Sequence, residues 1–386
     1  MQKYLPYLFT LFLLTSCGKQ TAEKEGRTVF RMNLFAGLST LDPAYGSDQS
    51  AVWMCGQLYN GLLELDSNLI LQPSIAKEWA VSDSGLSYTF HLRDDVYFHE
   101  SPLFGAQKTR KVIASDFQYS FQRLCDPEVA AKGFWIFNGK VEGIADFREG
   151  KTDKISGFEV ADDSTFIIHL TEPFAPFPNL LAMAYGSVVP HEVVTHFGKE
   201  FRSHPIGTGP FKMKSWQEGN SLILLKNEHY FESENGRQLP FVDAVKVRFI
   251  RERLSEFVEL CDGRLDFVNG IDKSTKDELL DISGEIKPKY KSAFQFDISP
   301  QLNTEFIGIL VDTTLPLLKG HPLANRKVRQ ALNYGLDRGA LVEFLLNGNG
   351  FPATSGMIPS GMPGYCLLYT SPSPRDLSTS RMPSSA

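Results

Sequence analysis

Residues 245–267, VKVRFIRERLSEFVELCDGRLDF, decide the fold class. Residues 245–250 predict a strand, and residues 254–261 predict a helix that Gly263 closes. Residues 264–267 then predict a short return strand. A strand, a helix and a strand in this order indicate a β-sheet covered by helices, and therefore an α/β fold.

Further strands and helices are predicted on both sides of this stretch. Asp83-Ser84-Gly85 and Gly219-Asn220 supply turn residues between strand-like runs, so we expect a β-hairpin around each. Leu58, Leu62 and Leu65 recur at helical spacing and predict a helix over residues 52–65. The remaining predictions are strands at residues 28–34, 166–170 and 304–311, and helices at residues 325–334 and 337–346.

One helix carries a start signal of its own. Ser115 followed three residues later by Gln118 has the pattern of a capping box, in which the serine caps the helix and the glutamine reaches back. Phe117, Phe121 and Leu124 then share one face. We expect this face to be buried.

Composition limits the class of protein. The chain has 386 residues, a formal net charge of −6 and no run rich in Lys or Arg, which argues against a nucleic-acid partner. A chain of this length should hold two or three domains, at roughly 100–200 residues each. The 12% aromatic content is high enough to line an apolar pocket as well as a core.

The N-terminus has the pattern of a bacterial lipoprotein signal. Lys3, an apolar run over residues 5–14 and the tetrapeptide Leu14-Thr15-Ser16-Cys17 predict a signal peptide at residues 1–16. Cys17 would then be the lipidated first residue, and the polar residues 17–27 a tether. The alternative is an ordinary secretory signal followed by a chance cysteine.

The last residues differ in character from the rest. Serine and proline dominate from Cys366 onward, and the runs 366–376 and 380–386 resemble the translation of a transposon-type sequencing adapter. We therefore expect residues 366–386 to be a non-native tail and the native sequence to stop near Tyr365, inside a domain.

Patterns for catalysis are absent from the sequence. In the motif His191-Glu192-Val193-Val194-Thr195-His196 the second histidine is five residues on rather than four, which separates the two rings around a helix. No nucleophile elbow and no phosphate-binding loop occur. Cys55, Cys125 and Cys261 have no metal-ligand spacing, and a disulfide between two of them stays open. We expect a protein that is not an enzyme and has no cofactor.

Several short motifs, in order, resemble the bacterial extracellular solute-binding proteins of family 5. They are Leu41-Asp42-Pro43, Asn60-Gly61-Leu62-Leu63, residues 73–79 and 88–93, Ala114-Ser115-Asp116-Phe117, Gly207-Thr208-Gly209-Pro210-Phe211 and residues 328–334. The resemblance implies a two-lobed periplasmic-binding-protein-like α/β fold of type II with an extra domain. Mapped here, lobe I is residues 28–60 plus 176–270, the extra domain is 61–175, and lobe II is 271–365, incomplete at its end.

The resemblance also indicates where a ligand is held. Peptide-binding relatives make first-lobe contacts just after Leu41-Asp42-Pro43, and the loop entering the returning first lobe is a second candidate. The candidate ligand-binding residues are Tyr45, Gly46, Ser47, Asp48, Gln49, Tyr185 and Ser187. For the first loop the alternative is an ordinary polar surface loop. Other motif residues, such as Trp79, Phe90 and Phe211, are expected in the core.

The resulting hypothesis is a lipid-anchored, monomeric solute receptor of an ABC importer on the extracytoplasmic side of the membrane. It would capture a short peptide and deliver it to the permease. One rival keeps the fold and binds a nickel chelate, haem or an oligosaccharide instead. A rival of another class is a secreted lipoprotein hydrolase, which needs a nucleophile–base pair or a metal triad.

Overall fold

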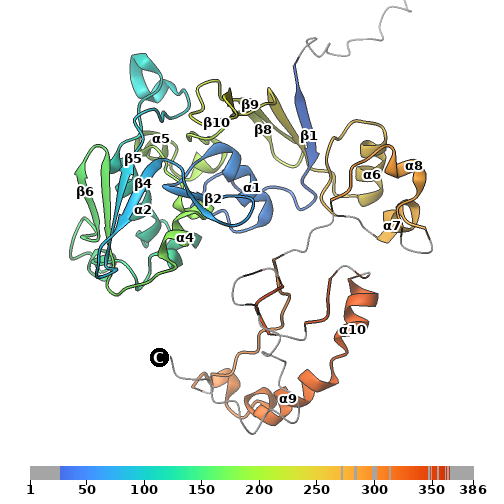
Figure 1. Ribbon diagram of the computed structural model, residues 1–386. Coiled ribbons are helices and arrows are strands. Elements are labelled where there is room, and N and C mark those ends of the chain that lie inside the picture. The colour runs from blue at the N-terminus through green and yellow to red at the C-terminus, as the bar shows by residue number, and fades with distance from the viewer. Residues whose placement is uncertain are drawn as a thin grey trace, which may run out of the picture. The chain divides into compact units, whose positions relative to one another are not determined.

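The computed structural model describes residues 27–270, 273–281, 285–297, 302–312, 314–346, 348, 350–353, 356–360, 362 and 365. The chain divides into two compact units, Met1–Ile271 and Asp272–Ala386 (Figure 1). The predicted signal peptide, Cys17 and the predicted tail 366–386 lie outside the described residues, as does all of the tether except Arg27. Within the described part, no helix has both the length and the apolar character needed to cross a bilayer.

The first sheet of the first unit has four strands in the order β1-β12-β9-β8. Strand β1 runs parallel to β12, and the other neighbours are antiparallel. Gly219 takes a φ of +70° between β8 and β9, so the predicted hairpin at this turn is confirmed. The strands are β1 Val29–Asn33, β12 Ala244–Arg248, β9 Ser221–Lys226 and β8 Phe211–Gln217.

The stretch 245–267 forms the strand and the helix that its pattern predicts. After β12 the chain forms helix α6, Arg253–Cys261, and Phe267 then pairs with Met32 of β1 in a parallel bridge. The return segment is therefore a single bridge and not a strand over residues 264–267. Parallel pairing on both sides of β1 gives the mixed α/β sheet.

One face of the first sheet is covered by helices and carries a hydrophobic core. Helix α1, Gln49–Leu58, supplies Met54 and Leu58, and helix α5, His191–Phe197, supplies Val193. These side chains pack with Leu222 and Val247 from the strands. Because successive strand residues point to opposite faces, Lys246 and Arg248 lie on the other face of β12.

The predicted helix over residues 52–65 is wrong beyond Leu58. Tyr59 is extended with a φ of −134°, and the chain continues into strand β2, Leu63–Leu65. Tertiary contacts override the leucine spacing, because the Asn60 N–H donates to Thr208 Oγ1 at 3.1 Å and Gly61 pairs with Ser187.

The second sheet of the first unit is antiparallel throughout, in the order β4-β5-β7-β6. It forms with β2 and β3 a separate part of the unit that contains the second hydrophobic core. Phe90, Phe121 and Phe166 are completely buried there, and the Phe121 ring lies 4.8 Å from the Phe137 ring. The strands are β3 Leu71–Pro73, β4 Ala76–Val81, β5 Ser87–Leu92, β6 Phe158–Asp162 and β7 Thr165–His169.

Helix α2, Ala114–Cys125, packs its predicted face on this sheet, and Phe117, Phe121 and Leu124 are buried. The predicted serine cap is wrong, because the N-cap residue is Ile113. The Asp116 carboxylate accepts the Ile113 N–H at 3.0 Å. Asp116 therefore reaches back to the cap, the role that the capping pattern assigned to Gln118.

The second unit differs from the prediction at one expected strand. In the second unit, the predicted strand at residues 304–311 is wrong: the described chain there has no strand, and Phe306 and Ile307 are 68% and 81% exposed. A strand requires a partner for its backbone groups, and no partner strand lies in the described part of this unit.

The predicted helix at 325–334 is confirmed, and Asp337 caps the next helix as expected. The remaining elements are α3 Ile144–Arg148, α4 Phe177–Leu181, β10 Ser233–Glu234, β11 Arg237–Gln238, α7 Lys273–Leu279, α8 Pro288–Lys291, α9 Arg326–Gly335, α10 Arg338–Ala340 and the π-helix Leu341–Leu345.

Candidate functional site

The loop after β1 is fixed by a buried ion pair. Arg123, on α2, donates from Nη1 and Nη2 to the two carboxylate oxygens of Asp42 at 3.0 and 2.5 Å. Asp42 Oδ1 also accepts the Ala44 N–H at 3.0 Å. Burial lowers the pKa of Arg123, but the hydrogen bond and charge of Asp42 outweigh it and hold that pKa above its ordinary value. The loop is thereby attached to the second sheet's part of the unit.

Tyr45 and Gly46 support this loop from within. Tyr45 Oη donates to the Val129 carbonyl oxygen at 2.6 Å, and the ring packs against the second core. Burial raises the pKa of the Tyr45 hydroxyl. Gly46 is buried over α1, where an added Cβ would lie 3.6 Å from both Ala51 Cβ and Cys55 Sγ.

Ser47, Asp48 and Gln49 are the exposed members of the candidate set. Ser47 Oγ accepts from Lys132 Nζ at 2.8 Å. Asp48 caps α1, because its Oδ1 accepts the Ala51 N–H at 2.9 Å. Gln49 is the first residue of that helix.

Tyr185 and Ser187 are placed differently, because both are buried, at 9% and 8% exposure. The 3-10 turn Ala184–Gly186 packs on α1, and burial raises the pKa of Tyr185, with a further contribution from the Asp48 charge. The Tyr185 ring lies against Gly133, where an added Cβ would be 2.6 Å from Cδ1. Ser187 instead pairs with Gly61 at the entry to β2.

Sequence reasoning missed the segment that joins these candidates. The N–H groups of Lys132 and Gly133 both donate to the Ala44 carbonyl oxygen, at 3.0 and 3.4 Å. Lys132 bonds Ser47, and Gly133 packs on Tyr185. Trp135, in the same 3-10 helix Lys132–Ile136, is 47% exposed. No motif marks this segment, so only the folded chain reveals that it lies beside the loop.

The loop motif Gly207-Thr208-Gly209 joins the two parts of the first unit. His99 Nε2 donates to the Gly209 carbonyl oxygen at 2.9 Å, and Thr208 Oγ1 donates to Asn60 Oδ1 at 3.0 Å. A Cβ on Gly207 would lie 2.0 Å from the Leu58 carbonyl oxygen. These motif residues are structural, since their polar groups bond to one another.

The site offers hydrogen-bonding and charged groups without a catalytic arrangement. An ammonium, a carboxylate, an amide and a hydroxyl are exposed close together at Lys132, Asp48, Gln49 and Ser47. Among the described residues, no group of three His, Cys, Asp or Glu side chains could hold a metal ion. In the histidine motif, Arg110 donates to Glu192 Oε1 at 2.6 Å. Cys55 and Cys125 are buried free thiols, and burial raises the pKa of both.

Comparison with known proteins gives the family. The sequence profile of the bacterial extracellular solute-binding proteins, family 5 Middle, matches residues 71–381. This range passes Tyr365, so the origin of residues 366–386 stays a prediction. The glutathione-binding proteins GsiB of Salmonella typhi and Escherichia coli O157:H7 are 26% identical over 334 residues, which is 86% of this chain and 56% of each relative. The chain thus spans little more than half the length of these relatives.

Solved structures show the same fold. The Escherichia coli murein tripeptide binding protein MppA is 24% identical with a TM-score of 0.69, over 87% of this chain and 60% of that one. Haemophilus influenzae OppA in complex with RPPGFSPFR is 23% identical with a TM-score of 0.69, over 87% and 61%. These neighbours confirm the expected two-lobed α/β fold, and the relatives are extracytoplasmic solute-binding proteins rather than enzymes. The match over residues 71–381 shows that the chain belongs to the bacterial extracellular solute-binding proteins of family 5.

Proposed function

We propose that this chain captures short peptides as the solute-binding component of an ABC importer and delivers them to the permease. The match to the family profile carries this proposal. Peptides are also the ligands named for several solved neighbours, and glutathione, the ligand named for GsiB, is itself a tripeptide. Because the chain spans little more than half of these relatives, peptide capture is proposed for the protein as a whole.

The loop after β1 would form part of the ligand contact. An extended peptide presents main-chain N–H and C=O groups at regular spacing, which exposed polar groups on a rigid loop can pair with. Ser47, Asp48 and Gln49 are the exposed groups, Tyr45, Gly46 and Tyr185 would support them from the buried side, and Ser187 would act from the entry to β2. The Asp42–Arg123 pair keeps the loop in place, so little ordering is needed on binding.

The lipid anchor is part of the same proposal. Lipidation of Cys17 would hold the receptor at the outer side of the cell membrane, close to its permease, with residues 17–27 as the tether. The protein would act as a monomer. Mass spectrometry of membrane fractions for a diacylated Cys17 tests the anchor, and an unmodified, secreted Cys17 would contradict it.

Calorimetric titration of the full chain with a mixture of dipeptides to pentapeptides tests peptide capture. Saturable binding is expected, and Gln49→Ala should weaken it about 2- to 10-fold by removing one hydrogen-bonding amide. Gln107→Ala, a matched change at an exposed residue outside the loop, should leave the affinity unchanged. If the chain binds a nickel chelate, haem or an oligosaccharide and no peptide, the peptide proposal is wrong and that solute is the ligand. If both variants bind peptide with the same affinity as the wild type, Gln49 does not contact the ligand.

A further inference from the structure

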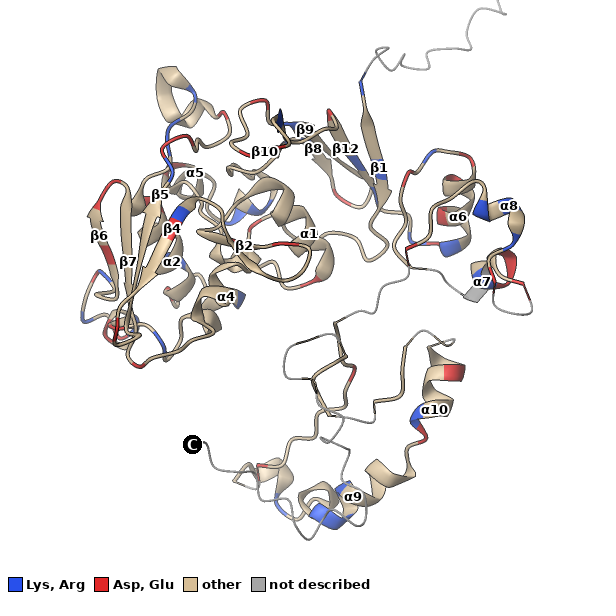
Figure 2. Ribbon diagram, viewed as in Figure 1, with Lys and Arg blue, Asp and Glu red and all other residues tan. Residues whose placement is uncertain are grey.

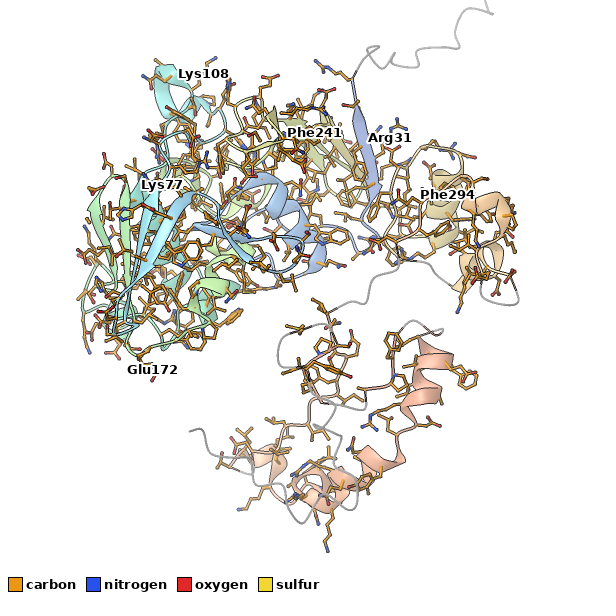
Figure 3. All side chains as sticks on the ribbon, in the orientation of Figure 1. Arg31, Lys77, Lys108, Glu172, Phe241 and Phe294 are labelled. Carbon is orange, nitrogen blue, oxygen red and sulfur yellow. The ribbon has the colours of Figure 1, made fainter. Side chains whose placement is uncertain are left out.

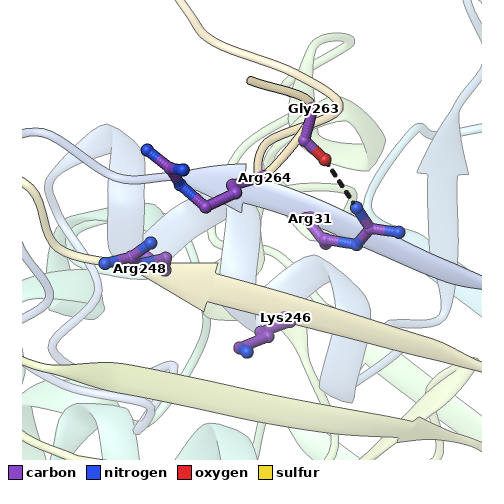
Figure 4. A pocket seen from close by; sticks show the side chains of 5 residues that line it. All are labelled: Arg31, Lys246, Arg248, Gly263 and Arg264. Atoms are coloured by element: carbon purple, nitrogen blue, oxygen red, sulfur yellow. Dashed lines mark hydrogen bonds between the residues drawn. The ribbon is translucent and has the colours of Figure 1, made fainter. Parts of the chain in front are cut away.

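Basic side chains surround one cavity on the first sheet. The cavity has a volume of about 200 Å³, and Figure 4 shows its lining residues: Arg31, Lys246, Arg248, Gly263 and Arg264. Arg31 lies on β1 (Figure 3), and the Lys and Arg residues of β12 are coloured in Figure 2. A cluster of four cations is unexpected in a chain whose net charge is −6.

The fold brings these residues together. The parallel register of β1 and β12 places Arg31 opposite Lys246. Lys246 and Arg248 alternate with buried Val247, so both lie on the face away from the first core. Gly263, with a φ of +68°, turns the chain after α6 and directs its carbonyl oxygen to Arg31 Nη1 at 2.8 Å. Arg264 follows directly.

Arg31 has an unused donor. The carboxylate of Asp266 accepts the main-chain N–H of Arg31 at 2.7 Å, whereas Arg31 Nε is 3.8 Å from the same oxygen, too far for a hydrogen bond. Among the described residues, this buried Nε has no hydrogen-bond partner. A buried N–H without a protein partner is unfavourable, and an ordered water or an ion commonly satisfies such a group.

The other cations are incompletely balanced. Arg248 and Arg264 share one carboxylate, that of Glu259, and Arg264 also pairs with Asp262 at 2.8 Å. The Lys246 ammonium forms no hydrogen bond or ion pair within the described part of the chain and is exposed. Counting Asp266, three carboxylates face four cations, so the cavity keeps a net positive charge.

We propose that this cavity is a binding site for a phosphate-type oxyanion, which goes beyond solute capture by the loop after β1. Lys246 Nζ is exposed and has no partner among the described residues, and the side chains of Arg31, Arg248 and Arg264 line the same cavity. A tetrahedral oxyanion presents several acceptors that such cationic donors can share. The volume of about 200 Å³ accommodates such a group. The phosphate belongs either to a free anion or to the headgroup of an anionic lipid, since both have the same chemistry.

Calorimetric titration of inorganic phosphate into the full chain, in low-salt buffer without other oxyanions, tests the site. Saturable binding of one phosphate is expected, and Lys246→Gln should weaken it about tenfold or more by removing a charge-assisted hydrogen bond. Lys214→Gln makes the same charge change at an exposed position on β8 of the same sheet and should alter the affinity less than twofold. Absence of saturable binding overturns the proposal. Equal weakening by both variants also overturns it, because general attraction would then explain the effect.

Vesicle pelleting distinguishes the source of the phosphate. If the full chain pellets with phosphatidylglycerol vesicles but not with phosphatidylcholine vesicles, and Lys246→Gln abolishes this, the site takes a lipid headgroup. If phosphate binds in the titration and neither vesicle pellets the chain, the site takes a soluble phosphate. Either result supports the cavity as an oxyanion site.

Discussion

His99 joins the two parts of the first unit, and we predict that it makes the stability of this unit depend on pH. The ring is 3% exposed, and Nε2 donates to the Gly209 carbonyl oxygen at 2.9 Å. Nδ1 accepts the Gly207 N–H at 3.3 Å, so the neutral ring satisfies both nitrogens. Protonation of Nδ1 would place two N–H groups against each other.

The size of the effect follows from the pKa. Burial lowers the pKa of His99 from its ordinary 6.5 to about 4, the Gly209 carbonyl opposes this change, and the charge of Lys212 adds to it. The unfolded chain therefore takes up a proton as the pH falls through 6.5, while the folded chain does so only near pH 4. Stability is lost across this window on acidification and is independent of this ring above it. At about 1.4 kcal/mol per unit of pKa difference, the loss amounts to roughly 3 kcal/mol.

Urea unfolding of the wild type and of His99→Gln between about pH 7.5 and pH 4 measures this loss. Glutamine keeps an N–H donor but does not titrate. The four tryptophans, Trp53, Trp79, Trp135 and Trp216, all lie in the first unit, so their fluorescence follows its unfolding. The wild type should lose roughly 3 kcal/mol more than the variant over this range. Other titrating groups occur in both proteins and cancel in the difference.

Parallel loss of stability in the two proteins would refute this reasoning, because His99 would then titrate alike in the folded and unfolded chains. An NMR titration of the His99 ring gives a second check. A ring pKa near 6.5 in the folded protein would contradict the role assigned to burial.

Thermal melting tests three further predictions. Gly207→Ala should destabilise the first unit by about 3 kcal/mol or more, because its Cβ would lie 2.0 Å from the Leu58 carbonyl oxygen; a change within 1 kcal/mol would contradict this packing. Gly56→Ala, inside α1 with nothing within 4 Å, should instead stabilise by about 0.5–1 kcal/mol, and a loss would contradict the open space there. Arg123→Met should cost about 3–5 kcal/mol by leaving the buried Asp42 carboxylate unpaired, and adding Asp42→Asn should recover part of it; additive losses would deny the coupling.

Local patterns predicted those elements whose signals agree with their tertiary contacts. The hairpin turns at Gly85 and Gly219 have a positive φ, as their turn residues predict. Phe117, Phe121 and Leu124 are buried on α2 because their spacing places all three on one face of the helix, and that apolar face packs against the second core. In these cases the sequence within a dozen residues contains the physical cause.

Predictions failed where a distant residue decides the structure. The leucine spacing over residues 52–65 is compatible with a helix, but Thr208 and Ser187 engage the backbone of Asn60 and Gly61 and hold it extended. Helix α2 begins two residues earlier than the capping pattern predicts, so that Asp116 takes the role expected of Gln118, and Asp116 also pairs with Arg110 at 2.7 Å. Thr208 and Ser187 lie far outside the window in which helical periodicity is recognised, and Arg110 lies outside the four-residue capping pattern.

In the candidate site, too, some residues could be predicted from the sequence and others only from the fold. Ser47, Asp48 and Gln49 could be proposed from their place after Leu41-Asp42-Pro43, because the resemblance to family 5 implies that peptide-binding relatives make first-lobe contacts there. Lys132 could not, since its position beside Ser47 depends on two main-chain bonds to Ala44 and on the fold of the second sheet's part. A ligand contact from this segment is thus invisible to local sequence patterns.

The motif residues and the exposed site residues have separable roles. Asn60, Thr208, Gly207 and His99 use their polar groups on one another, so changing them alters the junction between the two parts of the unit. Ser47 and Gln49 are exposed and can change without loss of core contacts. The motifs thus identify the family, whereas in the proposed function the choice of solute would depend on exposed loop residues that the motifs do not include.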